Sequence, residues 1–442
     1  METTHMLVCL VAAGLGSAIA AILAIVPALH VYNVAGAMLL ALSASPGSVS
    51  SEIVSFFFLG MVTGYALCNV IPSVFLSTPD ESTLFVVLPG QKYLMQRRGY
   101  EAVLLTGIGG LGGIGTLAAL SPFAPAVAPG LYRLLSPHLP WILWTVIAYV
   151  LLSEWPKGAG RGSDRWKRWW HGWKGLFAGL TTFVLSGLLG LVLFYRSPLS
   201  PRVAFQNLLP AFLGLFAIPC ILQNLLSRLE FPSQHIPHSL DITPLGLVQG
   251  ILSGVLGGLF AAFFPVVTGG VGGLIAGHAT SQRDDRLFLI AQGASKATYY
   301  VGGFLLFFVP GLHLTRGGMA LMTSTIWSAH TPQVYYLAVT AVMLSAIFSF
   351  FLLFPLTHLT IGLLASVHYR WISLSTLGLL LLIVAAMTGG SGLLICLVAT
   401  GIGLIPVLWG SRRMNSLGIL LLPIGLNMIG IGSAVARWLQ LI

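Results

Sequence analysis

The sequence predicts an all-α polytopic membrane protein, and three observations support that fold class. First, 56% of the 442 residues are hydrophobic and 7% are charged, with a mean hydropathy of +0.92, whereas soluble domains carry about 25% charged residues. Second, apolar runs of about 20 residues, the length of a helix that crosses a bilayer, recur along the chain. Third, 52 glycines and 24 prolines favour closely packed and broken helices. We expect roughly 10–12 membrane segments in two inverted repeats, with some segments broken or re-entrant.

The net charge of +10 is explained by membrane topology, not by nucleic-acid binding. Basic residues gather in the loop 157–174 and in the loop 92–98. The positive-inside rule predicts that both loops are cytoplasmic in a prokaryotic plasma (inner) membrane. Four tryptophans of the first loop favour an interfacial helix on the inner leaflet, in contact with membrane lipid. They are Trp166, Trp169, Trp170 and Trp173.

The cysteines predict neither a disulfide nor a metal or cofactor site. They are spread singly through apolar segments and form no CxxC or CxxCH motif. We therefore expect buried free thiols and no cofactor. The four are Cys9, Cys68, Cys220 and Cys396.

Residues 1–227 are expected to form the first repeat. Its first apolar segment, residues 7–26, is followed by Pro27, His30 and Asn33 inside a further apolar stretch. A proline there leaves a backbone carbonyl free, and the histidine and asparagine could line a cavity. The pattern predicts a broken helix, and a structural hydrogen bond is the alternative role for His30.

The stretch 71–84 is the most polar part of this apolar region. Pro79 interrupts helical hydrogen bonding, and Asp80 and Glu81 are costly at bilayer depth unless they face a cavity or a partner. We predict a break between two half-helices, with a short polar loop at the membrane surface as the alternative. The second half-helix is expected to be capped by Ser77 or Thr78 and to hold Pro79, Asp80 and Glu81 in its first turn.

Helices are expected on both sides of this stretch. One covers residues 53–72. Another, residues 102–120, is so rich in glycine that it can touch a neighbouring backbone, and it lacks the lysine and preceding strand of a phosphate-binding loop. A proline-rich linker with an amphipathic piece near 131–135 then leads to spans near 175–195 and 205–226.

A polar connector, residues 228–244, separates the two halves of the chain. It contains His235 and His238, with Pro237 between them. Because the proline prevents the two imidazoles from sharing a helix face, we expect a solvated loop instead of a metal site. Residues 245–442 then form the second repeat.

The second repeat begins like the first. A glycine-spaced helix runs into Pro265, which is followed by Thr268, Gly269 and Gly270. This order matches residues 14–36. Broken segments at corresponding places in two halves indicate a transporter binding site; chance similarity between glycine-rich helices is the alternative.

Lys296 lies inside an apolar helix of this second repeat. A lysine at that depth must pair with an acid or face water, and Asp80, Glu81 or Asp285 could neutralise it. The alternative is that its ammonium group snorkels to the membrane interface.

Taken in order, these motifs resemble the large membrane subunit of the tripartite tricarboxylate transporters, and more closely the tricarboxylate-transporter-like permeases of archaea and some bacteria. The resemblance spans nearly the whole chain. It implies a permease fold with a transporter-like site, and any solute-binding protein would be a separate partner. The matching stretches are 27–30, 75–83, 88–102, 265–270, 283–289 and 401–413.

Two departures from the family pattern bear on the substrate. Ala28 replaces a glycine next to proline, and Asp80 and Glu81 occupy the second loop. Two carboxylates would repel a citrate-like anion unless a cation or Lys296 offsets their charge. The resemblance therefore implies the fold and the site more directly than it implies a tricarboxylate substrate.

The leading hypothesis is an integral membrane permease, a secondary transporter that holds a small anionic or polar solute near the midplane. Asp80 and Glu81 would bind the coupling H⁺ or Na⁺. One alternative is a carrier for an anionic lipid, and another is a non-transporting subunit of a larger membrane complex. An intramembrane enzyme, with Cys68 and His30 or the two carboxylates as a dyad, has no supporting motif spacing. The residues expected to bind the solute are Pro27, His30, Asn33, Ser77, Thr78, Pro79, Ser82, Pro265, Thr268, Gly269, Gly270 and Lys296.

Overall fold

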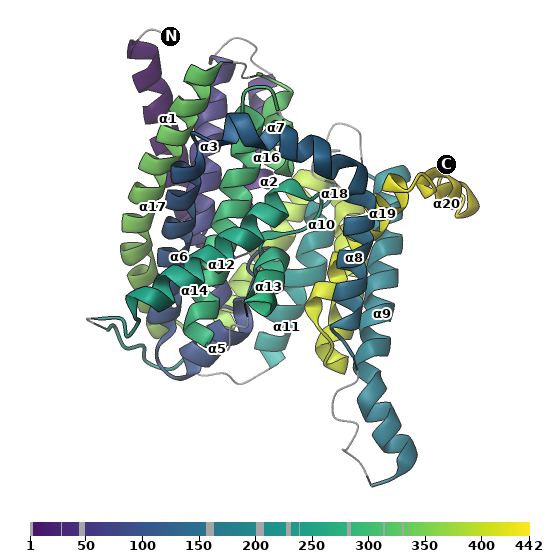
Figure 1. The fold of residues 1–442 in the computed structure, drawn as a ribbon. Helices are drawn as coiled ribbons and strands as arrows, with labels where there is room; N and C mark the ends of the chain where they lie inside the picture. Colours follow the sequence, from purple (N-terminus) through teal and green to yellow (C-terminus); the bar gives the residue numbers. More distant parts are fainter. Residues whose placement is uncertain are drawn as a thin grey trace. The chain divides into compact units, whose positions relative to one another are not determined.

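The computed structural model confirms an all-α polytopic membrane protein (Figure 1). It contains no strand in the part of the chain that it describes. Nine helices there are long and apolar enough to cross a membrane, or ten if the bent pair 413–428 and 432–438 counts as one span. The described residues are 3–27, 29–43, 49–155, 163–199, 207–226, 231–237, 239–280, 284–312, 314–328 and 331–442.

The chain forms two compact units. The first comprises residues 1–136 and 229–372, and the second comprises residues 137–228 and 373–442. Each unit therefore takes one segment from either side of the polar connector predicted at 228–244. This division is what two repeats would produce if each contributed to both units. The inverted repeat itself stays a prediction.

The first unit holds most of the helices that concern the site. Its first segment contains α1 (Thr3–Leu23), α2 (Val31–Ser43), α3 (Ser51–Cys68), α4 (Val70–Phe75), α5 (Val87–Met95), α6 (Gly99–Leu120) and α7 (Ala124–Leu135). Its second segment contains α12 (Pro244–Phe263), α13 (Gly269–Ala279), α14 (Asp285–Ala297), the π-helical turn η4 (Thr298–Gly302), α15 (Gly303–Phe308), α16 (Gly317–Ser324) and α17 (Pro332–Ser366).

The second unit contains the remaining helices. They are α8 (Leu139–Leu152), α9 (Arg165–Tyr195), α10 (Leu209–Phe212), the π-helical turn η3 (Leu213–Ala217), α11 (Ile218–Leu226), most of α18 (Tyr369–Trp409), η5 (Arg413–Leu417), α19 (Gly418–Met428) and α20 (Gly432–Trp438). All four cysteines are buried and free.

Glycines bring the helices of the first unit into backbone contact, as the sequence predicts. A methyl group added at Gly16 or Gly60 would lie 2.1 or 1.8 Å from a carbonyl oxygen where α1 meets α3. At Gly109 and Gly293, between α6 and α14, the corresponding distances are 2.0 and 1.9 Å. Such close approach maximises van der Waals contact between membrane helices. Gly14 is an exception, because an added methyl there would meet nothing within 4 Å.

Both proline-centred breaks predicted in the two halves are present. α1 ends at Leu23 and α2 begins at Val31, with Pro27 between them; Ala28 lies outside the described residues. α12 ends at Phe263 and α13 begins at Gly269, with Pro265 in the intervening turn.

The predicted start of the half-helix after Pro79 is wrong. α4 ends at Phe75 and α5 begins only at Val87, while residues 81–86 form turns. Neither Ser77 nor Thr78 therefore caps a helix. The Asp80 side chain stabilises these turns instead. Its carboxylate accepts the backbone N–H groups of the next turn, a local hydrogen bond that competes with helix formation.

The tryptophan-rich segment is not a separate interfacial helix. It forms the first turns of α9, a continuous helix of 31 residues. At 1.5 Å per residue α9 is about 46 Å long, which exceeds the hydrocarbon thickness of about 30 Å. Trp166, in the first turn of α9, is exposed. Residues 157–162 of the basic loop lie outside the described part.

Candidate functional site

A cluster of ionisable and hydroxyl side chains lies inside the first unit. Asp80 and Glu81, in the turns between α4 and α5, form its centre, with side chains that are 8% and 14% exposed. His30, in the break between α1 and α2, lies beside them and is 15% exposed. A buried polar cluster of this kind in an apolar protein is a functional-site candidate.

Asp80 is saturated with hydrogen bonds. One oxygen, Oδ1, accepts the N–H groups of Ser82 (3.0 Å) and Thr83 (2.8 Å) and both of their hydroxyls (2.8 Å each). The other, Oδ2, accepts from Asn69 Nδ2 at 2.7 Å and from the Tyr65 hydroxyl at 3.0 Å. A carboxylate offers about four acceptor positions, so Asp80 has none left for another ligand. It fixes the turns to α3.

Glu81 is much less constrained. Its Oε1 lies 3.0 Å from the Tyr300 hydroxyl and 3.4 Å from His30 Nε2, and no described residue donates to Oε2. The Tyr300 hydroxyl also lies 3.0 Å from Asp80 Oδ2 and 3.0 Å from His30 Nε2. Because a phenol has one hydrogen, Tyr300 can donate to only one of the two carboxylates at a time.

The protonation of His30 can be assigned from its other nitrogen. The backbone N–H of Tyr32 donates to His30 Nδ1 at 3.2 Å. In neutral imidazole the hydrogen is therefore on Nε2, which faces Tyr300 and Glu81. The network runs from His30 through the Tyr300 hydroxyl to a carboxylate.

Lys296 joins this network through an amide. It is 1% exposed, and its Nζ donates to Asn69 Oδ1 at 2.5 Å, while Asn69 Nδ2 donates to Asp80. Snorkelling is therefore wrong, because α14 lies inside the unit against α6 and α12. Asp285 is not its partner either. It pairs with Lys92 at the surface, and this hydrogen bond raises the pKa of Lys92.

The break in the second half meets the same turns. The Thr268 hydroxyl donates to the carbonyl oxygen of Glu81 at 3.0 Å and also accepts the N–H of Val271, which caps α13. Gly270 lies so close that an added methyl would be 2.8 Å from the carbonyl oxygen of Ser82. The α13 amino terminus, the positive end of the helix dipole, is thus in contact with the turns.

The remaining predicted site residues have different positions. An added methyl at Gly269 would be 2.8 Å from Lys296 Cα. Thr78 donates to the carbonyl of Pro72 at 3.3 Å, and Ser77 adopts a positive φ of 54°. These two residues and the buried Pro79 shape the turns. Pro27 and Pro265 mark helix breaks, and Asn33 is half-buried on α2.

Comparison with known proteins identifies the family. The sequence model of the tripartite tricarboxylate transporter TctA family matches residues 9–418. This chain belongs to the TctA family. An uncharacterized protein of Methanocaldococcus jannaschii is 24% identical over 380 residues, which are 83% of this chain and 86% of the relative. No solved structure matches the sequence. The predicted family is therefore confirmed, and the chain is an integral membrane transporter permease.

Three further residues belong to the site of this TctA protein but were not predicted from the sequence: Tyr65, Asn69 and Tyr300. A signal for them exists, because Tyr65 and Asn69 are four residues apart, as are Lys296 and Tyr300. Side chains with this spacing share a helix face. Two apolar helices that each carry a pair of polar residues on one face are predicted to pack with these faces toward each other.

The cluster of ionisable side chains in this TctA protein could hold a cation or exchange a proton. Ligand atoms of His30, Asp80 and Glu81 all lie within 4.8 Å of one another. Asp80 has no acceptor position left, so Glu81, with the Tyr300 hydroxyl and His30, is the part of the set that can change partners. The adjacent α13 amino terminus and Lys296 supply positive charge for an anion.

Proposed function

We propose that this chain moves a small anionic or polar solute by alternating access, with the coupling ion exchanged at Glu81. The observation that carries the proposal is the hydrogen bond from Thr268 to the Glu81 carbonyl. It joins a helix break in one half of the chain to the ionisable turns in the other. Discontinuous helices that meet in this way form the binding sites of many secondary transporters.

The two carboxylates are proposed to have different roles. Asp80 holds the turns in place, because every acceptor position is used. Glu81 gains and loses the proton or binds the sodium ion, because one of its oxygens has no described donor. When Glu81 is protonated it can donate to the Tyr300 hydroxyl, whose own hydrogen then turns away from Glu81.

The solute is proposed to bind beside the α13 amino terminus, which packs directly against Lys296. Backbone N–H groups and the helix dipole attract an anion there, and the Lys296 side chain adds positive charge behind them. A carboxylate solute would be repelled by Glu81 unless that group were protonated or neutralised by a cation. Solute and coupling ion would therefore bind together.

The orientation and partners are also proposals. Loops 92–98 and 157–174 would face the cytoplasm of a prokaryotic cell. A tripartite family implies further subunits, so a separate solute-binding protein and another membrane subunit are expected to act with this chain.

The test is a ligand screen on the purified full-length protein by thermal unfolding. It covers di- and tricarboxylates in sodium or choline buffers at several pH values, for the wild type, Glu81→Gln and the control Glu52→Gln. We expect a stabilising solute whose effect depends on sodium or pH, and this dependence should vanish only in Glu81→Gln. An unchanged ion dependence in Glu81→Gln would exclude the assigned role. No stabilising ligand, with partner proteins in fixed stoichiometry, would favour a non-transporting subunit.

A further inference from the structure

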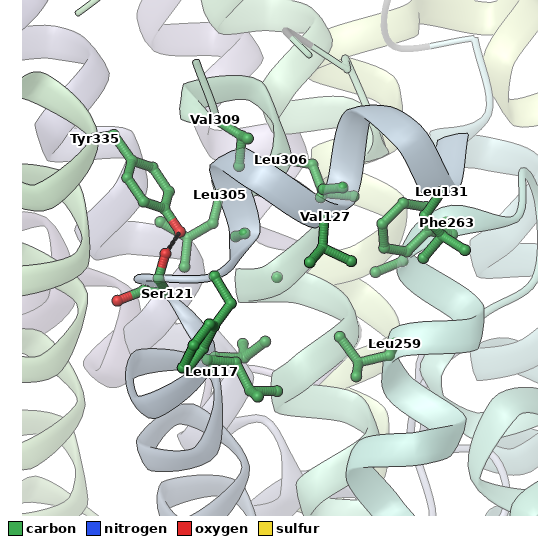
Figure 2. Close-up of a pocket in the computed structure, with 16 residues that line it drawn as sticks. Leu117, Ser121, Val127, Leu131, Leu259, Phe263, Leu305, Leu306, Val309 and Tyr335 are labelled. Atoms are coloured by element: carbon green, nitrogen blue, oxygen red, sulfur yellow. Dashed lines mark hydrogen bonds between the residues drawn. The ribbon is translucent and has the colours of Figure 1, made fainter. Parts of the chain in front are cut away.

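An apolar cavity of about 290 Å³ lies in the first unit, away from the ionisable cluster. Figure 2 shows side chains of α7, α12 and α15 around it, among them Val127, Leu259 and Leu305. Its lining includes two hydroxyl side chains, Ser121 and Tyr335, and the Tyr335 hydroxyl already donates to the Ser121 carbonyl at 3.0 Å. Water in this cavity would find few hydrogen-bond partners, so hydrocarbon is the fitting occupant.

The cavity lies where membrane helices end. Leu120 is the last residue of α6, Phe263 is the last of α12, and Tyr335 is in the first turn of α17. Val127 on α7 is 58% exposed, so the lining continues onto the outer surface of the unit. A lipid chain from the surrounding bilayer can therefore enter from the side.

Arg316, which has no acidic partner among the described residues, lies against residues that adjoin the cavity lining. The backbone and Cβ of Arg316 are 3.7 Å from the position of a methyl added at Gly303, the neighbour of the lining residue Gly302. The guanidinium also interacts electrostatically with Tyr132, the neighbour of the lining residue Leu131.

The Arg316 Nε is buried and has no hydrogen-bond partner among the described residues, and no described carboxylate pairs with the guanidinium. An unpaired buried donor on a charged group is costly. An anionic oxygen would satisfy both the Nε donor and the charge.

We propose that this cavity and Arg316 together bind an anionic membrane phospholipid. One acyl chain fills the cavity, and the phosphate accepts hydrogen bonds from the guanidinium. The charge of Arg316 selects the headgroup, and the apolar lining selects a chain-bearing ligand over a free phosphate. This lipid is a resident ligand, separate from the transported solute.

The lipid site touches the same short element as the ionisable cluster. Gly302 of η4 lines the cavity, and Tyr300 of η4 lies between the two carboxylates. Lipid in the cavity therefore restrains the backbone that positions Tyr300.

Native mass spectrometry of the full-length protein tests the proposal, with equal amounts of phosphatidylglycerol and phosphatidylcholine added. We expect preferential retention of phosphatidylglycerol by the wild type. Arg316→Gln should weaken that retention roughly tenfold, the effect of losing one charge-assisted hydrogen bond. Val127→Trp should fill the cavity and reduce retention of both lipids.

Two control variants change the same residue types elsewhere. Arg370→Gln removes an exposed arginine, and Leu252→Trp enlarges an exposed leucine of α12 outside the cavity lining. Both should bind lipid like the wild type, and all variants are first compared for size homogeneity and unfolding temperature. Unchanged phosphatidylglycerol preference in Arg316→Gln would overturn the proposal. So would stabilisation by inorganic phosphate equal to that by the lipid and insensitive to Val127→Trp.

Discussion

Lys296 on α14 donates a 2.5 Å hydrogen bond to Asn69, the residue that ends α3, and through that amide its charge reaches Asp80. Two helices from different halves of the chain are thereby joined by a buried cation and a buried anion that do not touch. An interposed amide satisfies both charges, whereas removal of either charge leaves the other uncompensated.

Lys296→Met should therefore destabilise the protein. It keeps the side-chain length but leaves Asn69 Oδ1 unpaired, at a cost of about 1–3 kcal/mol. Thermal unfolding in detergent measures the effect. Lys92→Met is the matched control, because Lys92 pairs with Asp285 at the exposed surface, where ion pairs contribute little. Equal shifts in both variants would contradict the assigned network.

Asp80→Asn and Glu81→Gln should separate stability from ion coupling. The asparagine amide would face the donors Tyr65 and Asn69, so Asp80→Asn should lower the unfolding free energy by about 1–3 kcal/mol. Glu81→Gln removes no comparable network and should unfold near the wild-type temperature while losing its response to sodium or pH. A reversed order of the two unfolding temperatures would refute the division of roles.

Tyr300→Phe should alter ion dependence with little loss of stability. The variant keeps the ring packing but removes the hydroxyl that lies 3.0 Å from both carboxylates. The pH dependence of ligand-induced thermal stabilisation should shift. Tyr299→Phe, which removes the neighbouring hydroxyl, is the control and should leave the profile unchanged. Identical profiles for all three proteins would argue against a role for Tyr300 in proton exchange.

Gly293→Leu should prevent close packing of α6 against α14. An added methyl already falls 1.9 Å from the Thr106 carbonyl oxygen, so a larger side chain must separate two backbones. Overpacking of this kind costs about 1–3 kcal/mol or more. The yield of monodisperse protein and its unfolding temperature report the loss. Gly115→Leu is on α6 where an added methyl meets nothing within 4 Å, and it should be tolerated.

The sequence predicts the features of the site that are energetically conspicuous. Ionisable side chains are rare and costly inside membrane segments, so His30, Asp80, Glu81 and Lys296 could be found without coordinates. The helix breaks at Pro27 and Pro265 follow from the missing N–H of proline.

Other features depend on packing that the sequence does not express locally. Tyrosine carries no charge at neutral pH and is less conspicuous in an apolar helix than a carboxylate or a lysine, so composition alone does not single out Tyr65 and Tyr300. α5 starts at Val87 because the Asp80 side chain accepts hydrogen bonds from the backbone of the preceding turns. From the sequence alone, Ser77 or Thr78 is an equally good candidate to cap an earlier helix. Arg316 is noticeable only in the structure, where its Nε has no partner among the described residues.

The π-helical geometry of η4 has a mechanical consequence. Residues Thr298–Gly302 contain one residue more per turn than the α-helices on either side. Relaxation of that turn to α-geometry would rotate the residues after it by up to about 100° relative to α14, and the Tyr300 hydroxyl would move relative to both carboxylates. A change of helical register at η4 would therefore link a rotation of α15 to the contacts that Tyr300 makes.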